Sequence, residues 1–208
     1  MQLTFQHPAR DTNWHKVLCV PGTPLVYVRS PKCASTYYYG LLKANGWKDI
    51  KFNDIDWEQH HVFSFITEPY VRHVKGLVQD IVGAGIEKIL LNWHGASFWE
   101  DLPWLGGHSQ PLTFTFGDKF DLIDWIPIDG DKTSETILTG LLNQYQIELD
   151  WSHKISNTES DDYRKSVFKQ IMMLGGPKKR DYFYTYNNDL EIYNKACLNH
   201  GVVSKTPR

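Results

Sequence analysis

Two segments constrain the fold of this chain more than any other feature, because each reads as an apolar strand followed by a polar turn and a helix. The first runs from Leu25 to Leu42 (LVYVRSPKCASTYYYGLL) and the second from Val62 to Leu77 (VFSFITEPYVRHVKGL). A turn of this kind directs backbone N–H groups towards an anion. Two such turns in one chain indicate a ligand that carries two separated anionic groups.

Further strands and helices alternate along the chain. Apolar periodicity, prolines and glycines predict strands at 25–29, 62–67 and 120–126, and helices at 35–44, 69–82, 83–91, 133–145, 160–174 and 188–199. Ser35 or Thr36 is expected to cap the first helix. Residues 92–119 form a long segment with little periodicity, and such loops tend to be functional or mobile. The alternation predicts an α/β fold with a mostly parallel sheet between helices.

Size, charge and cysteine content narrow the class of protein. The chain of 208 residues fits one domain that spans 1–208. A formal net charge of −2 leaves no broad basic surface for nucleic acid. Three cysteines without a CxxC pair argue against a disulfide framework and a zinc site, and favour a reducing compartment. Because residues 1–20 have no apolar core and no run of 18 apolar residues occurs, we expect a cytoplasmic protein without a membrane anchor.

The turn of the first segment, Ser30 to Thr36, has the composition of an anion-binding loop. Its backbone N–H groups can surround an oxyanion while the ammonium of Lys32 neutralises charge. The GxxxxGK[ST] spacing of a Walker A loop is missing. The alternative is a surface turn with a solvated lysine and a helix cap. We interpret Cys33 as a small packing residue.

Taken together, the two segments resemble the PAPS-dependent sulfotransferases, particularly the carbohydrate branch. The family loop PK-x-(G/A)-(S/T)-(S/T) holds the 5′-phosphosulfate. It is matched by Pro31, Lys32, Cys33, Ala34, Ser35 and Thr36. The resemblance implies a P-loop-like three-layer fold, PAPS (3′-phosphoadenosine 5′-phosphosulfate) as co-substrate and no metal. It also implies that Lys32 stabilises the leaving phosphate, while the N–H groups of 33–36 and the hydroxyls of Ser35 and Thr36 hold the 5′-phosphate.

The second segment departs from the family pattern. Where the family has R-D-P-x-x-R-x-x-S, whose first Arg and last Ser bind the 3′-phosphate, this chain has Thr67-Glu68-Pro69-Tyr70-Val71-Arg72-His73-Val74-Lys75. We hypothesise that Lys75, supported by Thr67, pairs with the 3′-phosphate. Arg72 either contributes or only packs. The competing interpretation is that the 3′-phosphate is poorly held or that another donor nucleotide is used.

Weaker similarity to the family continues downstream, so that the resemblance spans roughly Leu25 to Ala196. The segments are His108-Ser109-Gln110-Pro111, Phe120 to Asp129, His153 to Thr158, and a Tyr-x-x-Asp helix start at Tyr186-Asn187-Asn188-Asp189. None of them would establish the resemblance alone.

An acceptor hydroxyl needs a base, and His or Glu fills that role in the family. Glu58, His60 and His61 precede the second strand, in a loop that we expect at the same end of the sheet as the donor loops. His61 is the first choice, and His60 and Glu58 are reserves. His94 and His108 in the long segment compete as base or acceptor ligand.

Two further patterns have a structural and a functional interpretation. The basic run Lys178-Lys179-Arg180 either reaches over the 3′ side of the nucleotide or is a solvated helix entry. No HxxxH or HExxH spacing places two histidines on one helix face, so we expect no metal site.

The predicted function is therefore a sulfotransferase that moves a sulfuryl group in line from PAPS to a hydroxyl or amine, with carbohydrate as the favoured acceptor class. The resemblance favours a carbohydrate, as do Trp93, Trp99 and Trp104 in the long segment. The alternatives are a small-molecule kinase of the P-loop type and a catalytically silent nucleotide-binding protein of the same fold. Because the chain is short for the family, we expect either a shallow acceptor cleft or a homo-oligomer in which a second subunit supplies one wall of the cleft.

Overall fold

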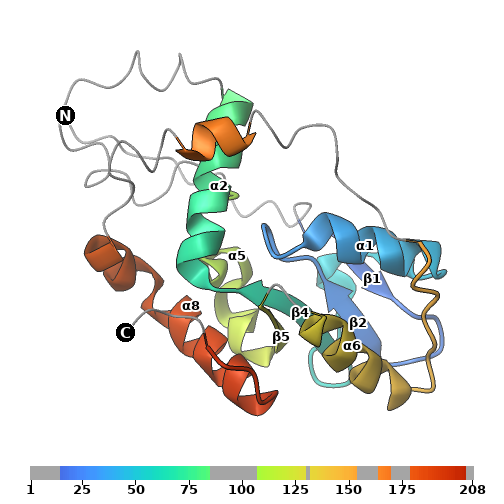
Figure 1. Ribbon diagram of the computed structural model, residues 1–208. Coiled ribbons are helices and arrows are strands. Elements are labelled where there is room, and N and C mark those ends of the chain that lie inside the picture. Colours follow the sequence, from blue (N-terminus) through green and yellow to red (C-terminus); the bar gives the residue numbers. More distant parts are fainter. Residues whose placement is uncertain (1–14, 85–106, 130–131, 154–163, 170–178, 205–208) are drawn as a thin grey trace.

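A five-stranded mixed sheet forms the centre of the structure (Figure 1). The computed structural model of the protein describes residues 15–84, 107–129, 132–153, 164–169 and 179–204. The strands are β1 (Val17–Cys19), β2 (Leu25–Val28), β3 (Lys48–Ile50), β4 (His61–Thr67) and β5 (Asp124–Ile128), in the order β3-β1-β2-β4-β5. β1 is antiparallel to both neighbours, whereas β2, β4 and β5 are parallel. The predicted α/β class with a mostly parallel centre is confirmed.

Helices flank this sheet. They are α1 (Ser35–Ala44), α2 (Pro69–Ala84), α5 (Leu112–Phe116), α6 (Thr133–Asn143) and α8 (Lys179–Asn199), with 3-10 helices at Phe52–Asp54 and Gly117–Leu122. α8 is kinked at Tyr186, where φ is −117° and ψ is 18°. The predicted helices at 35–44 and 69–82 are confirmed. Of the helix expected at 160–174, the structure describes only 164–169, and these residues are helical. Residues 85–91 of the helix expected at 83–91 lie outside the described residues.

The central strands are apolar on both sides because both faces of the sheet are covered. All four residues of β2 are buried. Phe65 of β4 stacks on Tyr38 of α1, with ring centroids 3.6 Å apart. Ser64 pairs with Trp125 across the sheet, so Trp125 lies on the opposite face, where its ring contacts Phe116 edge-on at 5.5 Å. The described core is therefore built on both sides of β4.

Three local predictions need correction. The strand expected at 120–126 begins only at Asp124, because Phe120 belongs to a 3-10 helix, packs on Trp125 at 5.2 Å and accepts its indole N–H at 3.0 Å. An apolar run does not distinguish these conformations. β1 and β3 were not predicted, since three residues are too few for an alternating pattern. The long segment 92–119 contains α5, and its residues 92–106 lie outside the described residues.

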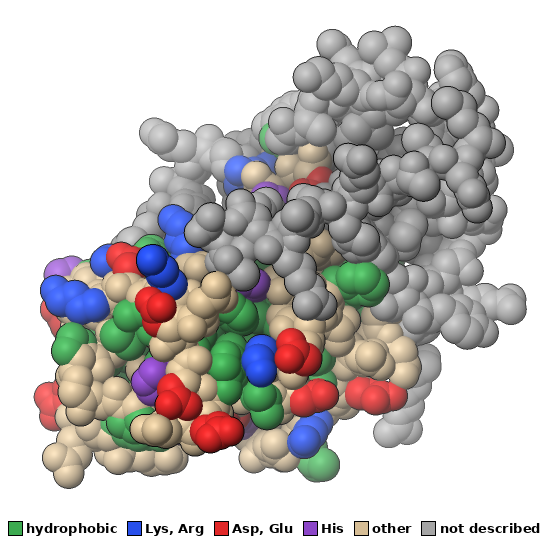
Figure 2. Space-filling model, turned by 180° about the vertical axis from the view of Figure 1, so that it is seen from behind, with side chains coloured by type: hydrophobic (Ala, Val, Ile, Leu, Met, Phe, Trp, Pro, Cys, Tyr) green, Lys and Arg blue, Asp and Glu red, His purple; other side chains and the backbone are tan. Residues whose placement is uncertain are grey.

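The described surface carries charges of both signs. Figure 2 shows one face on which basic and acidic side chains are interspersed with hydrophobic ones, in keeping with a formal net charge of −2. None of the helices in the described part of the chain combines the length and the apolar character that a bilayer crossing requires.

Candidate anion-binding site

The two strand-to-helix turns lie side by side at a change in the direction of the chain connections. β2 leads through α1 towards β3 on one side of the sheet, whereas β4 leads through α2 towards β5 on the other. β2 and β4 are adjacent and parallel, so their carboxyl ends share one edge. In open α/β sheets, ligands bind at such a switch point. Both turns therefore open at the same edge of the sheet.

Two buried serine hydroxyls join the strand ends at this edge. Ser30 donates to the carbonyl of Phe65 at 2.5 Å, and Ser64 donates to the carbonyl of Val28 at 2.6 Å. Both serines have no exposed surface. Each hydroxyl crosses between the strands near the point where β2 ends, so the start of the turn is fixed relative to β4.

The turn itself has an uncommon backbone. Lys32 and Ala34 have φ of 62° and 50°, the left-handed region that residues with a side chain seldom adopt. Such conformations cost about 1–3 kcal/mol each and persist only where the surrounding structure enforces them. Ala34 is the N-cap of α1 and no side chain caps the helix, so the predicted capping by Ser35 or Thr36 is wrong. The leading N–H groups of a helix lack intrahelical acceptors, and an anion can supply them.

The residues of the turn differ in access to solvent. Cys33 and Ser35 are buried, whereas Ala34 and Thr36 are exposed and Pro31 is half-buried. Burial raises the pKa of the Cys33 thiol. This arrangement agrees with the packing role expected for Cys33, and it makes Thr36 the more accessible of the two hydroxyls.

Lys32 is the half-buried cation of the turn. Its Nζ donates to Oε1 of Gln79 on α2 at 3.0 Å. Burial and, to a lesser extent, the positive charges of Arg164, Lys75 and Arg29 lower the pKa of Lys32 to about 8, against the opposing effect of Asp80. We call these six residues the Lys32 cluster: Arg29, Lys32, Lys75, Gln79, Asp80 and Arg164. The cluster has four cationic side chains and one carboxylate, which is the charge balance of an anion site.

The structure brings Lys75 to the side of α2 that holds Lys32. Lys75 is exposed and precedes Gln79 by four residues, so both lie on one face of the helix. Thr67 is only 9% exposed, and its hydroxyl donates to the carbonyl of Ile128 at 3.5 Å. Among the described contacts, Thr67 has none with Lys75. The positive charge of Lys75 contributes to the lowered pKa of Lys32, so the two residues are electrostatic neighbours. Support of Lys75 by Thr67 stays a prediction.

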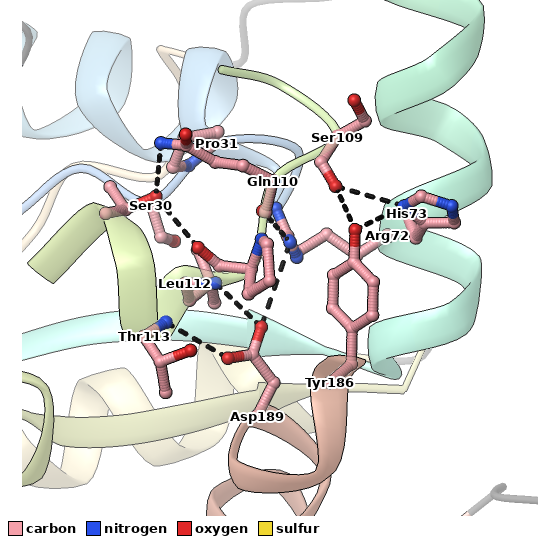
Figure 3. A network of polar contacts seen from close by, with 12 residues as sticks. Ser30, Pro31, Arg72, His73, Ser109, Gln110, Leu112, Thr113, Tyr186 and Asp189 are labelled. Atoms are coloured by element: carbon pink, nitrogen blue, oxygen red, sulfur yellow. Dashed lines mark hydrogen bonds and ion pairs between the residues drawn. The ribbon is translucent and has the colours of Figure 1, made fainter. Parts of the chain in front are cut away.

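Arg72 lies in a buried polar network, away from solvent (Figure 3). Its Nη1 donates to the carbonyl of His108 at 3.4 Å, and its Nη2 donates to that of Gln110. The carboxylate of Asp189 lies 3.8 Å from Nη2, and both side chains are fully buried. Asp189 also accepts the N–H groups of Leu112 and Thr113 at 2.7 and 3.0 Å. These contacts favour the packing role that the sequence left open for Arg72.

The same network includes the tyrosine of the Tyr-x-x-Asp pattern. The hydroxyl of Tyr186 donates to the carbonyl of Ser109 and contacts Nδ1 of His73 at 2.6 Å. Nδ1 of His73 lies 3.0 Å from the same carbonyl. Burial lowers the pKa of His73 to about 4, so the imidazole is neutral near pH 7. Tyr186 and Asp189 thus attach α8 to α2 through the segment 108–113.

That segment also approaches α2 closely beside the Lys32 cluster. A Cβ at Gly76 would meet the carbonyl oxygen of His108 at 2.2 Å, so only glycine permits this distance. Nδ1 of His108 lies 2.9 Å from Oδ1 of Asp80. Oδ2 of Asp80 accepts the N–H and the hydroxyl of Ser109 at 3.0 and 2.6 Å. Gln79 and Asp80 are consecutive residues of α2; Gln79 binds Lys32 and Asp80 binds His108.

His61, His60 and Glu58 are not at this site, and the expectation that their loop lies at the same end of the sheet as the donor loops is wrong. His61 pairs with Leu25, the first residue of β2, whereas Lys32 follows the last. A loop that precedes a strand lies at the amino edge. β4 has seven residues, which separates its two ends by about 20 Å. His61 instead contacts Tyr145 at 2.7 Å and Asp124 at 3.1 Å.

The two reserve residues have local partners at the amino edge as well. Nδ1 of His60 accepts the N–H of Asp56 at 3.0 Å, and the N–H of Glu58 donates to the Asp56 carboxylate at 3.1 Å.

The remaining candidates lie partly outside the described residues. These are His94, Trp93, Trp99, Trp104 and Lys178, whereas Lys179 and Arg180 begin α8. In the described part, no group of three or more His, Cys, Asp or Glu side chains could hold a metal ion.

Gln79, Asp80 and Arg164 belong to the site but were not predicted from the sequence. The first two follow Lys75 and Gly76 by four residues, so helical spacing could have indicated them. No local signal marks Arg164.

Comparison of the chain with family models, curated proteins and solved structures finds no match in any of the three.

Proposed function

We propose that this protein is a PAPS-dependent sulfotransferase with a sulfotransferase-like fold, acting on a hydroxyl or amine, with carbohydrate as the favoured acceptor class. The observation that carries the proposal is the position of Lys32. It occupies a left-handed turn at the switch point, within a cluster of four cations and one carboxylate. The PKCAST resemblance indicates which ligand binds there. The acceptor class depends on that resemblance and on the tryptophans of the long segment.

The proposed reaction uses Lys32 at the oxygen that leaves. The bond between the sulfuryl sulfur and the bridging phosphate oxygen breaks while a bond from sulfur to the acceptor oxygen forms. Negative charge grows on the leaving phosphate, and the ammonium of Lys32 stabilises it. The donation of Lys32 to Gln79 orients the ammonium beforehand, so that little reorganisation is needed.

His108 replaces His61 as the proposed general base. The carboxylate of Asp80 orients its Nδ1, which leaves the lone pair of a neutral imidazole on Nε2. The His108 side chain is 40% exposed, and its partner Asp80 is the residue next to Gln79. His108 can therefore take a proton from an acceptor placed opposite the leaving group.

His108→Asn is expected to lower the single-turnover transfer rate by about 10²–10⁴-fold, because the proton acceptor is lost. His61→Asn is the matched control at the other edge of the sheet and should retain the rate. Rapid-quench measurement with saturating PAPS separates chemistry from binding. Equal rates for His108→Asn and wild type would remove His108 from this role.

Binding of adenosine 3′,5′-bisphosphate tests the shared premise of these assignments. Calorimetry should show tighter binding of this nucleotide than of adenosine 5′-monophosphate, and Lys75→Ala should abolish the difference. Because an anion favours the charged form of Lys32, whose pKa is about 8, affinity should fall as pH rises above 8, by up to about tenfold per pH unit. Preference for ATP would indicate the kinase alternative, and binding without transfer would indicate the silent protein. Equal discrimination in Lys75→Ala would refute the assignment of Lys75 to the 3′-phosphate.

A further inference from the structure

Arg164 is a cation of the Lys32 cluster that comes from a distant part of the chain. It begins the helical turn 164–169, which is drawn in orange in Figure 1. Val167 is only 3% exposed and follows Arg164 by three residues, so both lie on the inward face of this turn. Lys165 and Lys169, by contrast, are exposed. The buried valine thus fixes the turn with Arg164 directed inward.

The guanidinium of Arg164 is incompletely satisfied within the described structure. Its Nε is buried and has no hydrogen-bond partner there, and no described carboxylate forms an ion pair with Arg164. A buried donor without an acceptor is costly, typically about 1–3 kcal/mol. Arg72 also has an unpartnered Nε, but its terminal nitrogens reach two carbonyls and Asp189. Arg164 therefore has donor capacity and charge that a ligand can use.

The charges around Lys32 indicate that the ligand is an anion and that its phosphate or sulfate group lies among these cations. Arg164 exerts the largest effect of any charged neighbour on Lys32, larger than that of Lys75. Asp80 is the sole acidic neighbour in the Lys32 cluster, and it also accepts two donors from Ser109. Cations held together in this way repel one another unless an anion lies between them. A guanidinium pairs with phosphate or sulfate oxygens through two parallel N–H donors.

We infer that Arg164 binds the same anionic group as Lys32, and that this group is the phosphosulfate end of the donor or another sulfate or phosphate ester. The inference deepens the proposed function and depends on it for the identity of the nucleotide. It assigns the 164–169 turn to the donor site, with Arg164 and Lys32 as neighbouring cations. The two cations then hold the leaving phosphate from two sides.

The test uses inorganic pyrophosphate, which resembles the phosphosulfate group, alongside adenosine 3′,5′-bisphosphate. Arg164→Gln should weaken calorimetric binding of both by about 10- to 100-fold, the range for a lost charged hydrogen bond. Lys169→Gln is the matched control on the same turn and should bind both as wild type. Titration of isotopically labelled Lys32 by NMR gives a readout without ligand: Arg164→Gln should raise the Lys32 pKa from about 8 towards its usual 10.5, and Lys169→Gln should not.

The outcomes separate the two proposals. Pyrophosphate binding that depends on Arg164, without binding of the nucleotide, would support the inference and overturn the proposed donor. Unchanged pyrophosphate affinity in Arg164→Gln would overturn the inference even if wild type binds the nucleotide. A wild-type protein that binds neither anion would overturn both.

Discussion

Replacement of Lys32 by methionine is expected to lower the single-turnover rate of sulfuryl transfer by about 10²–10³-fold, the loss typical of removing one donor that stabilises developing negative charge. Methionine keeps the length and apolar stem of lysine but cannot donate to Gln79 or neutralise the leaving phosphate. Because both residues have a Cβ, the left-handed φ of 62° is strained equally in either protein. The stability of the variant should therefore change little.

Lys43→Met is the matched control for this experiment. Lys43 pairs with Asp49 at 2.7 Å on the surface, where the two side chains are 38% and 56% exposed. It belongs to α1, the helix that follows the anion loop, so a general effect of losing one positive charge would appear in this variant too. Rates should be compared in rapid-quench assays at saturating PAPS. A Lys32→Met protein that transfers as fast as Lys43→Met would remove Lys32 from the mechanism.

Lys32→Arg gives a second, independent result. Arginine stays charged at all accessible pH values, so the fall in nucleotide affinity above pH 8 should disappear in this variant. Its planar fork does not reproduce the point charge of an ammonium next to Gln79, and transfer should stay well below wild type. A pH dependence that persists in Lys32→Arg would assign the titration to another group.

The central fold could be predicted because its elements carry strong local signals. β2 is an apolar run between Pro24 and Pro31, and β4 is an apolar run followed by Pro69. α1 and α2 follow these strands directly, so the type and order of these four elements were legible. β1 and β3 have three residues each, and their pairing with the centre depends on residues far apart in sequence. No window of the sequence contains that information.

The errors about the site have a topological cause. His61 is close to the second turn in sequence, but a strand carries the chain across the sheet, so residues before and after β4 lie at opposite edges. Conversely, His108 and Arg164 are distant in sequence from Lys32, and only tertiary packing brings them towards it. The Tyr-x-x-Asp pattern predicted a helix start, but it did not reveal Arg72 and the 108–113 segment as its partners.

The buried pair of Arg72 and Asp189 is expected to be the most sensitive point of the described structure. Arg72→Met should lower the free energy of unfolding by about 3–5 kcal/mol, because it leaves a buried carboxylate without its cation. Burial raises the pKa of Asp189, and the Arg72 guanidinium opposes that effect. Loss of the guanidinium therefore favours the protonated acid, whose remaining hydrogen bonds to Leu112 and Thr113 are weaker.

Urea denaturation of four variants would measure this effect. Lys43→Met breaks an exposed ion pair and should cost no more than about 1 kcal/mol. Asp189→Leu should resemble Arg72→Met, since each single change leaves one buried charge unpaired. The double variant should be less destabilised than the sum of the two, because neither charge then remains. Additive losses, or a loss for Arg72→Met as small as for Lys43→Met, would contradict a coupled pair.

The consequence for function follows from what this pair connects. Arg72 lies on α2, one turn before Gly76 and two turns before Gln79 and Asp80, and it bonds the carbonyls of His108 and Gln110. The same contacts that stabilise the fold therefore set the distance between α2 and the segment that carries His108. A correctly folded Arg72→Met protein at low temperature should bind nucleotide but transfer slowly. Lys32→Met should have the unfolding free energy of wild type and still transfer slowly. The two variants thus distinguish a residue that positions the site from one that acts in it.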